Sequence, residues 1–352
     1  MTEPIGTEPL LSLCFPTYRR AALLGQALRA ALTQITPALS AEVEVVVLDN
    51  ASPDDTPAVV ACARQDFPHV AFHVVRRPEN IGPDANFCDA PAQAQGRFVL
   101  LLSDDDVLLP GGVAALLEAI RRDPDLDAVA LNTRPFRHSP EEPTAGVFRT
   151  ATDRLLVGRD EVLDYLWVHL TYLSCLAFRR EAVLGRDYRP YYGSSLAQCY
   201  LFLDALAPGR GVYATRTPFV AQRAGNNSGF EYFEVFVTNY VALMRHAART
   251  GYAPEAVGRI ITRQMRFICY GICVFKSQGF IGEIRPRYLD GLARLWRVYG
   301  PHPFLLLVIV PLLLLPSLVY RLLFDRAFSL FRRVRAWRAA LGPAAGVKGG
   351  AL

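Results

Sequence analysis

Short apolar runs alternate with amphipathic stretches along the first 135 residues of this 352-residue chain. Apolar runs of this kind are typical of buried parallel strands, and the amphipathic stretches between them are typical of helices that cover a sheet. We therefore expect an α/β fold whose mostly parallel sheet is flanked by helices. The predicted strands are 10–15, 43–48, 70–75, 98–102 and 128–131, and the predicted helices are 21–32, 56–65, 85–95 and 111–122.

The pattern becomes less regular after residues 135–143, which are rich in Pro and charge and predict a surface loop. Helical stretches are expected at 160–170, 196–206, 231–249 and 255–275. Between them lie an apolar segment at 174–178, a strand-like run at 212–215 and a polar turn at 222–228. The sequence thus predicts a mainly helical C-terminal extension, with boundaries near residues 135, 230 and 297.

Polar residues collect directly after four of the predicted strands. They occupy positions 16–19, 49–52, 76–80 and 103–106. In open parallel sheets, ligands bind outside the carboxyl ends of the strands. Four loops that converge on one edge therefore predict a pocket there.

The last of these loops, Ser103-Asp104-Asp105-Asp106, follows the apolar run FVLLL. Carboxylates this close repel one another, and each must be hydrogen-bonded, shifted in pKa or neutralised by a cation. Mg²⁺ takes oxygen ligands and typically combines one or two protein carboxylates with substrate phosphates. The residues alone leave a second interpretation open, in which Ser103 or an Asp only caps the helix that starts near Gly111.

Composition narrows the class of protein. The chain is 51% hydrophobic and 20% charged, which is typical of globular proteins. Its seven cysteines are scattered and include no C-x-x-C pair, so we predict neither a disulfide framework nor a zinc site. The first residues have no basic and apolar signal-peptide pattern, which predicts a cytosolic compartment.

The net charge of +5 is unevenly distributed. Residues 281–352 carry ten Arg and one Lys against three acidic residues, a net +8, which leaves −3 for residues 1–280. A basic tail behind a slightly acidic body favours an anionic membrane surface over a nucleic acid as partner. We therefore expect no nucleic-acid partner.

An uncharged segment precedes that basic tail. Residues 304–320 are nearly all Leu, Val, Ile and Pro. As a helix they would cover about 26 Å, which is short of the roughly 30 Å hydrocarbon core of a bilayer. We expect a segment broken by Pro311 and Pro316 that dips into the membrane and returns; a buried core helix is the alternative.

Four motifs, in order and spacing, resemble one known family. They are LSLCFPTYRRAALLGQAL, VEVVVLDNASPDDT, RRPENIGPDANF and GRFVLLLSDDDVLLPGGV. They are similar to the nucleotide-binding half of bacterial family 2 glycosyltransferases, whose Rossmann-like fold is named GT-A. NIGPDANF, SSLAQCYLFLDAL and AGNNS look most like the abequosyltransferase-like branch of O-antigen and exopolysaccharide enzymes. The resemblance covers about residues 10–230.

The resemblance implies roles for individual residues. Pro16, Thr17 and Tyr18 would line the nucleoside pocket, and Asp49 would accept a hydrogen bond from the base. Asp104 and Asp106 would be the D-x-D pair: Asp106 would ligate Mg²⁺ or Mn²⁺ on the donor diphosphate, and Asp104 would face the ribose or a metal-bound water. The other implied donor contacts are Asn80, Gly82, Asn86 and Asp105, with Arg19, Arg76 and Arg223 as further cations near the diphosphate.

One departure from the family concerns the general base. Many inverting members carry a carboxylate downstream of D-x-D that deprotonates the acceptor hydroxyl. The corresponding loop here reads YYGSSLAQ, at 191–198, and contains no carboxylate. Asp187 and Asp204 flank it and are weak candidates, so the base stays unassigned and a mechanism without a strong base stays open.

The implied function is transfer of one sugar from a nucleotide donor to a polyprenyl-diphosphate-linked saccharide, at the cytoplasmic face of the inner membrane. Two alternatives remain: transfer to polyprenyl phosphate, and a non-catalytic sugar-nucleotide-binding scaffold. A dehydrogenase is disfavoured because FPTYRR lacks the G-x-G-x-x-G fingerprint. The implied units are a nucleotide-sugar half (1–135), an acceptor half (136–230), a helical extension (231–297) and a membrane-associating tail (298–352), with anchoring through about 298–340.

Overall fold

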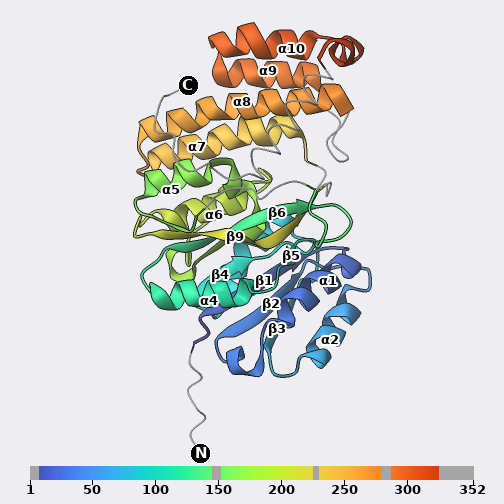
Figure 1. Ribbon diagram of the computed structural model, residues 1–352, viewed down its shortest axis with the longest axis vertical. Coiled ribbons are helices and arrows are strands. Elements are labelled where there is room, and N and C mark those ends of the chain that lie inside the picture. Colours follow the sequence, from blue (N-terminus) through green and yellow to red (C-terminus); the bar gives the residue numbers. More distant parts are fainter. Residues whose placement is uncertain (1–7, 145–151, 225–229, 279–286, 325–352) are drawn as a thin grey trace, which may run out of the picture.

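The computed structural model describes residues 8–144, 152–224, 230–278 and 287–324. In these ranges nine strands form one sheet in the order β3-β2-β1-β4-β8-β6-β9-β5, with β7 paired to β9. Helices cover both faces of the sheet, and α7 to α10 lie stacked beyond one face (Figure 1). The strands are β1 Leu11–Thr17, β2 Val43–Asp49, β3 Ala71–Arg76, β4 Phe98–Leu101, β5 Val107–Leu108, β6 Ala128–Phe136, β7 Arg154–Leu156, β8 Leu176–Arg179 and β9 Val212–Arg223.

The sheet is parallel through β3, β2, β1 and β4, and again between β6 and β9. Strand β8 is antiparallel to both β4 and β6, so it joins the two parallel parts. The α/β fold with helices on both faces is therefore confirmed. The expected units 1–135 and 136–230 share this sheet.

Alternate residues of the central strands enter two different cores, because successive side chains of a strand point to opposite faces. Leu11 and Leu13 of β1 pack with α1 (Ala21–Leu32), α2 (Thr56–Asp66) and α4 (Gly112–Arg122). Cys14 packs on the other face with α3 (Pro83–Gln93), α5 (Arg159–Leu166) and α6 (Ala197–Leu206). Burial on both faces explains why these strands read as continuous apolar runs.

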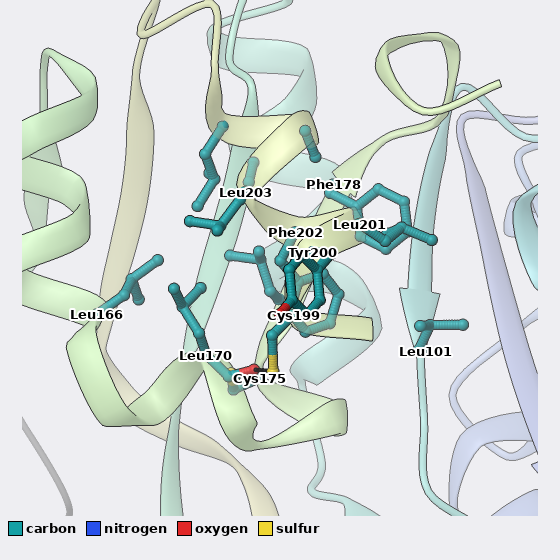
Figure 2. Close-up of a cluster of buried hydrophobic side chains, with 14 of the residues drawn as sticks. Leu101, Leu166, Leu170, Cys175, Phe178, Cys199, Tyr200, Leu201, Phe202 and Leu203 are labelled. Carbon is teal, nitrogen blue, oxygen red and sulfur yellow. Dashed lines mark hydrogen bonds between the residues drawn. The ribbon is translucent and has the colours of Figure 1, made fainter. Parts of the chain in front are cut away.

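The core on the α6 side is the larger one. Figure 2 shows Leu101, Leu166, Leu170 and Phe178 gathered with residues 199–203 of α6, and all of them are buried. The Cys199 thiol donates to the carbonyl of Leu170 at 3.2 Å. All seven cysteines are free, as predicted.

The second half of the chain differs from its predicted pattern at two places. The helix expected at 160–170 ends at Leu166, where Trp167 adopts a φ of 24° and the chain tightens into a 3₁₀ turn, Trp167–Thr171. The strand expected at 212–215 continues to Arg223, because residues 218–223 pair with β6 beyond a register shift. Tertiary pairing, which the local pattern does not contain, decides both.

The C-terminal helices form a third core of their own. A π-helical turn, Glu234–Asn239, leads into α7 (Tyr240–Arg249), and α8 (Pro254–Gln278) follows. Helix α9 (Tyr288–Tyr299) and α10 (Val310–Leu314) lie furthest from the sheet (Figure 1). Buried Phe233, Ile272 and Leu305 are among the residues that join these helices.

One expectation about the apolar segment is wrong: Pro311 does not break it. Pro311 lies in the first turn of α10, where a missing N–H is tolerated, and a π-helical turn, Leu305–Ile309, precedes it. The chain turns instead before Pro316. No single helix in the described ranges is both long and apolar enough to cross a membrane, but Leu305–Leu314 and Ser317–Phe324, bent by 110°, meet that criterion together.

A buried lysine holds this bend. The ammonium group of Lys276, on α8, donates to the carbonyls of Leu313 at 2.8 Å and Leu315 at 2.6 Å. These carbonyls lie where α10 ends, so the lysine satisfies acceptors that the helix leaves unpaired. It also lies 3.9 Å from the centre of the Tyr288 ring. The basic residues from 326 onward lie outside the described residues.

Candidate functional site

The aspartate loop that follows β4 lies against the end of β1. Thr17 Oγ1 donates to Asp104 Oδ2 at 2.8 Å, and Arg20 Nη1 donates to Asp104 Oδ1 at 3.0 Å. The same guanidinium group lies 3.7 Å from Asp105. The two loops are 87 residues apart in sequence, as the Thr17–Asp104 pair shows, and they meet because β1 and β4 are parallel neighbours.

Asp106 is held from the other half of the sheet. Ser174, which precedes β8, donates its hydroxyl to Asp106 Oδ2 at 2.7 Å. The backbone N–H of Arg223, at the end of β9, donates to Asp106 Oδ1 at 3.0 Å. Asp105 accepts from the hydroxyl of Ser103 at 2.6 Å. The cluster is therefore built by both halves of the chain.

Burial dominates the electrostatics of the cluster. It raises the pKa of Asp106 to about 7, with further contributions from the charges of Asp105 and Asp104. It also raises the pKa of Asp104, although Arg20 opposes this shift. The guanidinium group of Arg20 faces Asp104 and Asp105, and that of Arg223 contacts the Asp105 carbonyl. A site with three carboxylates and only oxygen ligands fits a hard divalent cation.

A preformed cage of protein ligands is not present. Within the ranges given above, no group of three or more His, Cys, Asp or Glu side chains is arranged to hold a metal ion. Any cation at this cluster would take most of its ligands from a bound molecule or from water.

The loop after β2 carries a second carboxylate. Asp49 is buried; its Oδ1 accepts the N–H of Ser52 at 2.8 Å, and its Oδ2 lies 3.5 Å from the guanidinium of Arg76, at the end of β3. The Ser52 hydroxyl in turn accepts the N–H of Arg19 at 3.0 Å. The ends of β1, β2 and β3 are therefore tied together around Asp49.

The loop before α3 joins this network through an asparagine. Asn50 Nδ2 donates to Asn80 Oδ1 at 2.9 Å and to the Gly82 carbonyl at 3.2 Å. Gly82 adopts a φ of 85°, which disfavours residues with a side chain. Asn86, one turn into α3, donates to the carbonyl of Leu48 at 3.0 Å. All four predicted loops thus meet at one edge of the sheet.

Sequence reasoning missed several residues of this edge. The cation that reaches the aspartates is Arg20, whereas Arg19 directs its guanidinium towards Tyr18, 5.9 Å from the ring centre. Arg19 has a φ of 57°, and this left-handed turn precedes α1. Asn50 and Ser174 were also missed. The signal in the sequence for Arg20 is its position next to Arg19 in FPTYRR.

The two weak base candidates lie elsewhere. Asp187 is exposed and paired with Arg189, which lowers the pKa of Asp187 to about 2. Asp204 accepts from the Tyr188 hydroxyl at 3.0 Å and lies 3.3 Å from Arg186. Neither carboxylate contacts the aspartate cluster.

The loop that lacks a carboxylate receives one from another helix. Asp84, in the first turn of α3, accepts the N–H of Gly193 at 2.8 Å and that of Ser195 at 3.1 Å. Asp84 is buried, and burial raises its pKa. In sequence, PDAN reads as an ordinary start of a helix, so nothing marked this residue.

Comparison with known proteins identifies the region that carries this site. Residues 12–184 match the model of glycosyl transferase family 2. This region is similar to that family. It contains the predicted donor residues from Pro16 to Asp106, whereas the loop at 191–198 and Arg223 lie beyond it.

Curated relatives share part of the chain. A Campylobacter jejuni GalNAc(5)-diNAcBac-PP-undecaprenol beta-1,3-glucosyltransferase is 33% identical over 110 residues, 31% of this chain and 34% of that protein. The succinoglycan biosynthesis protein ExoO of Rhizobium meliloti is 29% identical over 149 residues, 40% of each chain. The matches thus span two-fifths or less of these relatives.

Solved structures match over a longer range. S. aureus TarS 1–349, crystallised with UDP-GlcNAc, has a TM-score of 0.59 at 18% identity and covers 93% of each chain. The mannosyltransferase PcManGT of Pyrobaculum calidifontis, in complex with GDP-Man and Mn²⁺, has a TM-score of 0.51 at 19% identity, covering 94% of this chain and 88% of the other. At these identities the likeness shows the fold, and the GT-A fold is confirmed.

Proposed function

We propose that this protein is a glycosyltransferase that moves a single sugar from a nucleotide-sugar donor to a lipid-linked saccharide during synthesis of a bacterial surface polysaccharide. The observation that carries this proposal is the aspartate loop of a family 2 domain, held against the end of β1 by Thr17 and Arg20. The donor belongs at the edge where the four loops meet.

The proposed donor roles are those that the family resemblance implies, and the geometry of that edge supports them. Pro16, Thr17 and Tyr18 line the nucleoside, and Asp49 accepts from the base. The guanidinium group of Arg76 lies 3.5 Å from Asp49 Oδ2. Asn80, Gly82 and Asn86 shape the loop beside the donor, and Asn50 fixes that loop. Asp104 and Asp105 lie nearest to Arg20, and with Arg19 they complete the donor contacts.

Mg²⁺ or Mn²⁺ would be held by Asp106, with Asp104 directly or through water. Such an ion supplies Lewis-acid stabilisation of the charge that develops on the departing diphosphate. Arg20 neutralises part of the cluster without a metal, and Arg223 Nε donates to the Asp105 carbonyl at 3.3 Å, which fixes the aspartate loop from the side of β9. Metal dependence is supported by excess negative charge in the cluster.

The acceptor is proposed to be a polyprenyl-diphosphate-linked saccharide at the cytoplasmic face of the inner membrane. One relative carries PP-undecaprenol in its name, which supports a lipid-linked acceptor. The bent pair at 305–324 exposes a row of apolar side chains, with Leu307 at 77% and Leu322 at 78% exposure. Exposed apolar side chains of this kind, followed in sequence by a basic tail, fit an anionic membrane.

A two-step experiment tests the function. Purified protein is first screened with UDP-, GDP- and dTDP-sugars by thermal shift, with and without Mn²⁺, and hits are incubated with polyprenyl-diphosphate-linked saccharide or with polyprenyl phosphate. We expect a metal-dependent shift with one nucleotide class and product only with the saccharide-bearing lipid. Donor binding without transfer or donor hydrolysis would support the scaffold alternative and contradict the proposal.

A further inference from the structure

Asp84 is a buried carboxylate that none of the proposed donor contacts uses. It is 5% exposed, and its Oδ2 accepts the two N–H groups of Gly193 and Ser195. Its Oδ1 is buried and has no hydrogen-bond partner among the described residues by distance and angle, although the backbone N–H groups of Ala197 and Ser194 also act to lower the pKa of this carboxyl group. Unpartnered buried polar atoms are rare in native proteins, and one beside a functional site points to a ligand or a catalytic role.

Asp84 contacts the loop in which a general base was expected and is missing. The loop at 191–198, which leads into α6, contains no carboxylate, whereas the resemblance to family 2 enzymes implies one there. Asp84 contacts the backbone of this loop from α3, so the fold brings a carboxylate there from a segment 109 residues earlier. Two residues before Asp84, Gly82 belongs to the loop that Asn50 fixes at the donor edge.

The loop itself is firmly positioned. Its Ser194 carbonyl accepts from Asn239 Nδ2 at 2.8 Å, and Tyr191 stacks on Tyr200 with ring centres 3.7 Å apart. Ser195 has a φ of 58°, a conformation that is strained for a residue with a side chain and that is found most often at functional sites. The bonds from Asn239, Asp84 and the tyrosine stack thus fix the place of the carboxylate relative to α6.

We propose that Asp84 is the general base of the transfer reaction; this inference rests on the function proposed above. Asp84 Oδ1 takes the proton of the acceptor hydroxyl while the hydroxyl oxygen forms a bond to the anomeric carbon of the donor sugar. The bond from that carbon to the diphosphate oxygen breaks, and the nucleoside diphosphate leaves with the electron pair. Each atom and charge of a direct displacement is then accounted for.

The surroundings of Asp84 suit this role. Burial raises its pKa above the ordinary value of an aspartate, against the effect of its backbone hydrogen bonds, which strengthens it as a proton acceptor. The titratable neighbours are Cys88 on α3 and Cys199 on α6, and burial raises the pKa of both thiols, so both stay neutral. Among the described residues, no basic side chain contributes to the pKa shift of Asp84.

The decisive variant is Asp84→Asn. The amide oxygen of Asn can accept both loop N–H groups, so the loop keeps its anchor while the basic oxygen is lost. We expect kcat with a hydroxyl acceptor to fall by about 10²- to 10⁴-fold, the usual contribution of a general base. Affinity for the nucleoside diphosphate and the melting temperature should change little. Asp89→Asn, which removes a carboxylate paired with Arg77 on the same helix, is the matched control and should keep its turnover within a few-fold.

Azide separates catalysis from loop geometry, because it attacks the anomeric carbon without losing a proton. Transfer to azide should be nearly equal in the wild type and in Asp84→Asn. If Asp84→Asn loses transfer to both acceptors, Asp84 only shapes the site. If Asp84→Asn keeps full turnover with the hydroxyl acceptor, Asp84 is not the base. Both results overturn the proposal. If Asp84→Asn does not fold, Asp84→Glu replaces it and should slow hydroxyl transfer alone, so that unchanged transfer to both acceptors overturns the proposal. A wild-type chain that consumes no donor contradicts the proposed function itself.

Discussion

Apolar residues are used differently in the N-terminal strands and in the bent helix pair near the C-terminus. Strands β1 and β2 have seven residues each, and all of them are buried. In the bent pair near the C-terminus, Leu305, Ile309 and Leu313 are buried at a spacing of four residues, while Leu307 and Leu322 face outward. The first pattern builds an edge that positions polar loops, whereas the second leaves apolar side chains exposed, which the proposed membrane contact would cover.

The two regions differ in which kind of group lies in an unfavourable environment. At the donor edge, polar and charged groups are desolvated, and the cost appears as a raised pKa of Asp106. At the bent pair, apolar groups are hydrated, and the cost is exposed surface that burial in a membrane would remove. Lys276 combines the two situations, because it is an ionisable group buried beneath the bent helix pair. Burial lowers the pKa of Lys276.

The largest expected effect is at Asp106. Asp106→Asn should abolish transfer and metal-dependent donor binding, because Asp106 is the proposed metal ligand. The folded pKa of about 7 lies above the ordinary value, so ionised Asp106 destabilises the fold above pH 7 and does so less as the pH falls towards the ordinary pKa. The melting temperature of Asp106→Asn relative to wild type should therefore be higher at pH 8 than at pH 5. Differential scanning fluorimetry in EDTA measures this, and wild-type turnover in excess EDTA would contradict the metal role.

The second effect concerns the membrane. Replacing Leu307 and Leu322 with Glu removes two exposed side chains, each worth about 1.5 to 3 kcal/mol on full burial. Binding to vesicles with anionic lipid should fall at least about 100-fold, while donor binding is unchanged. Leu155→Glu, at a position 54% exposed on β7, is the matched control. Co-sedimentation of all three proteins decides it, and equal binding would show that this face is not the membrane contact.

These two regions also differ in what their sequence reveals. The strands and helices of the donor half were predictable because residues such as Leu13 and Cys14 alternate between two cores, which forces an apolar run. The aspartate cluster was visible because three acids follow such a run. The sequence did not show that Arg20, rather than Arg19, reaches the aspartates, because this depends on the left-handed turn at Arg19. It did not show the contacts of Asp84 either, because the partners of Asp84 are backbone N–H groups of a distant loop.

The presence of helices in the C-terminal part could be predicted from the sequence, but where these helices end could be predicted less well. Helix α8 follows its pattern, but the end of α5 at Leu166 and the passage of the helix through Pro311 depend on packing. Lys276 illustrates the reason. Its ammonium group donates hydrogen bonds to two carbonyls that become available only because α10 ends beside α8. Local pattern carries no signal for such a contact.

A smaller effect is expected at Asp49. Asp49→Ala removes the hydrogen bond that we propose Asp49 accepts from the base. A hydrogen bond to a charged group is worth about 1.5 to 3 kcal/mol, which corresponds to an affinity about 10- to 150-fold weaker. Because Asp49 also accepts the N–H of Ser52, Asp49→Asn serves as the variant that preserves the loop. Isothermal titration with the nucleoside diphosphate checks both. Unchanged affinity in both variants would remove Asp49 from the site.

The smallest effect is expected at the two carboxylates that flank the loop at 191–198. Asp187→Asn breaks only an exposed ion pair with Arg189, and such pairs contribute little. Asp204→Asn can keep the hydrogen bond from Tyr188, although it loses its pairing with Arg186 and should lower the melting temperature slightly. Turnover should stay within a few-fold of wild type in both, measured with the same lipid-linked acceptor as Asp84→Asn. A loss of about 10²-fold or more in either variant, with normal donor binding, would instead identify that residue as the base, because a misplaced loop would disturb transfer to azide as well.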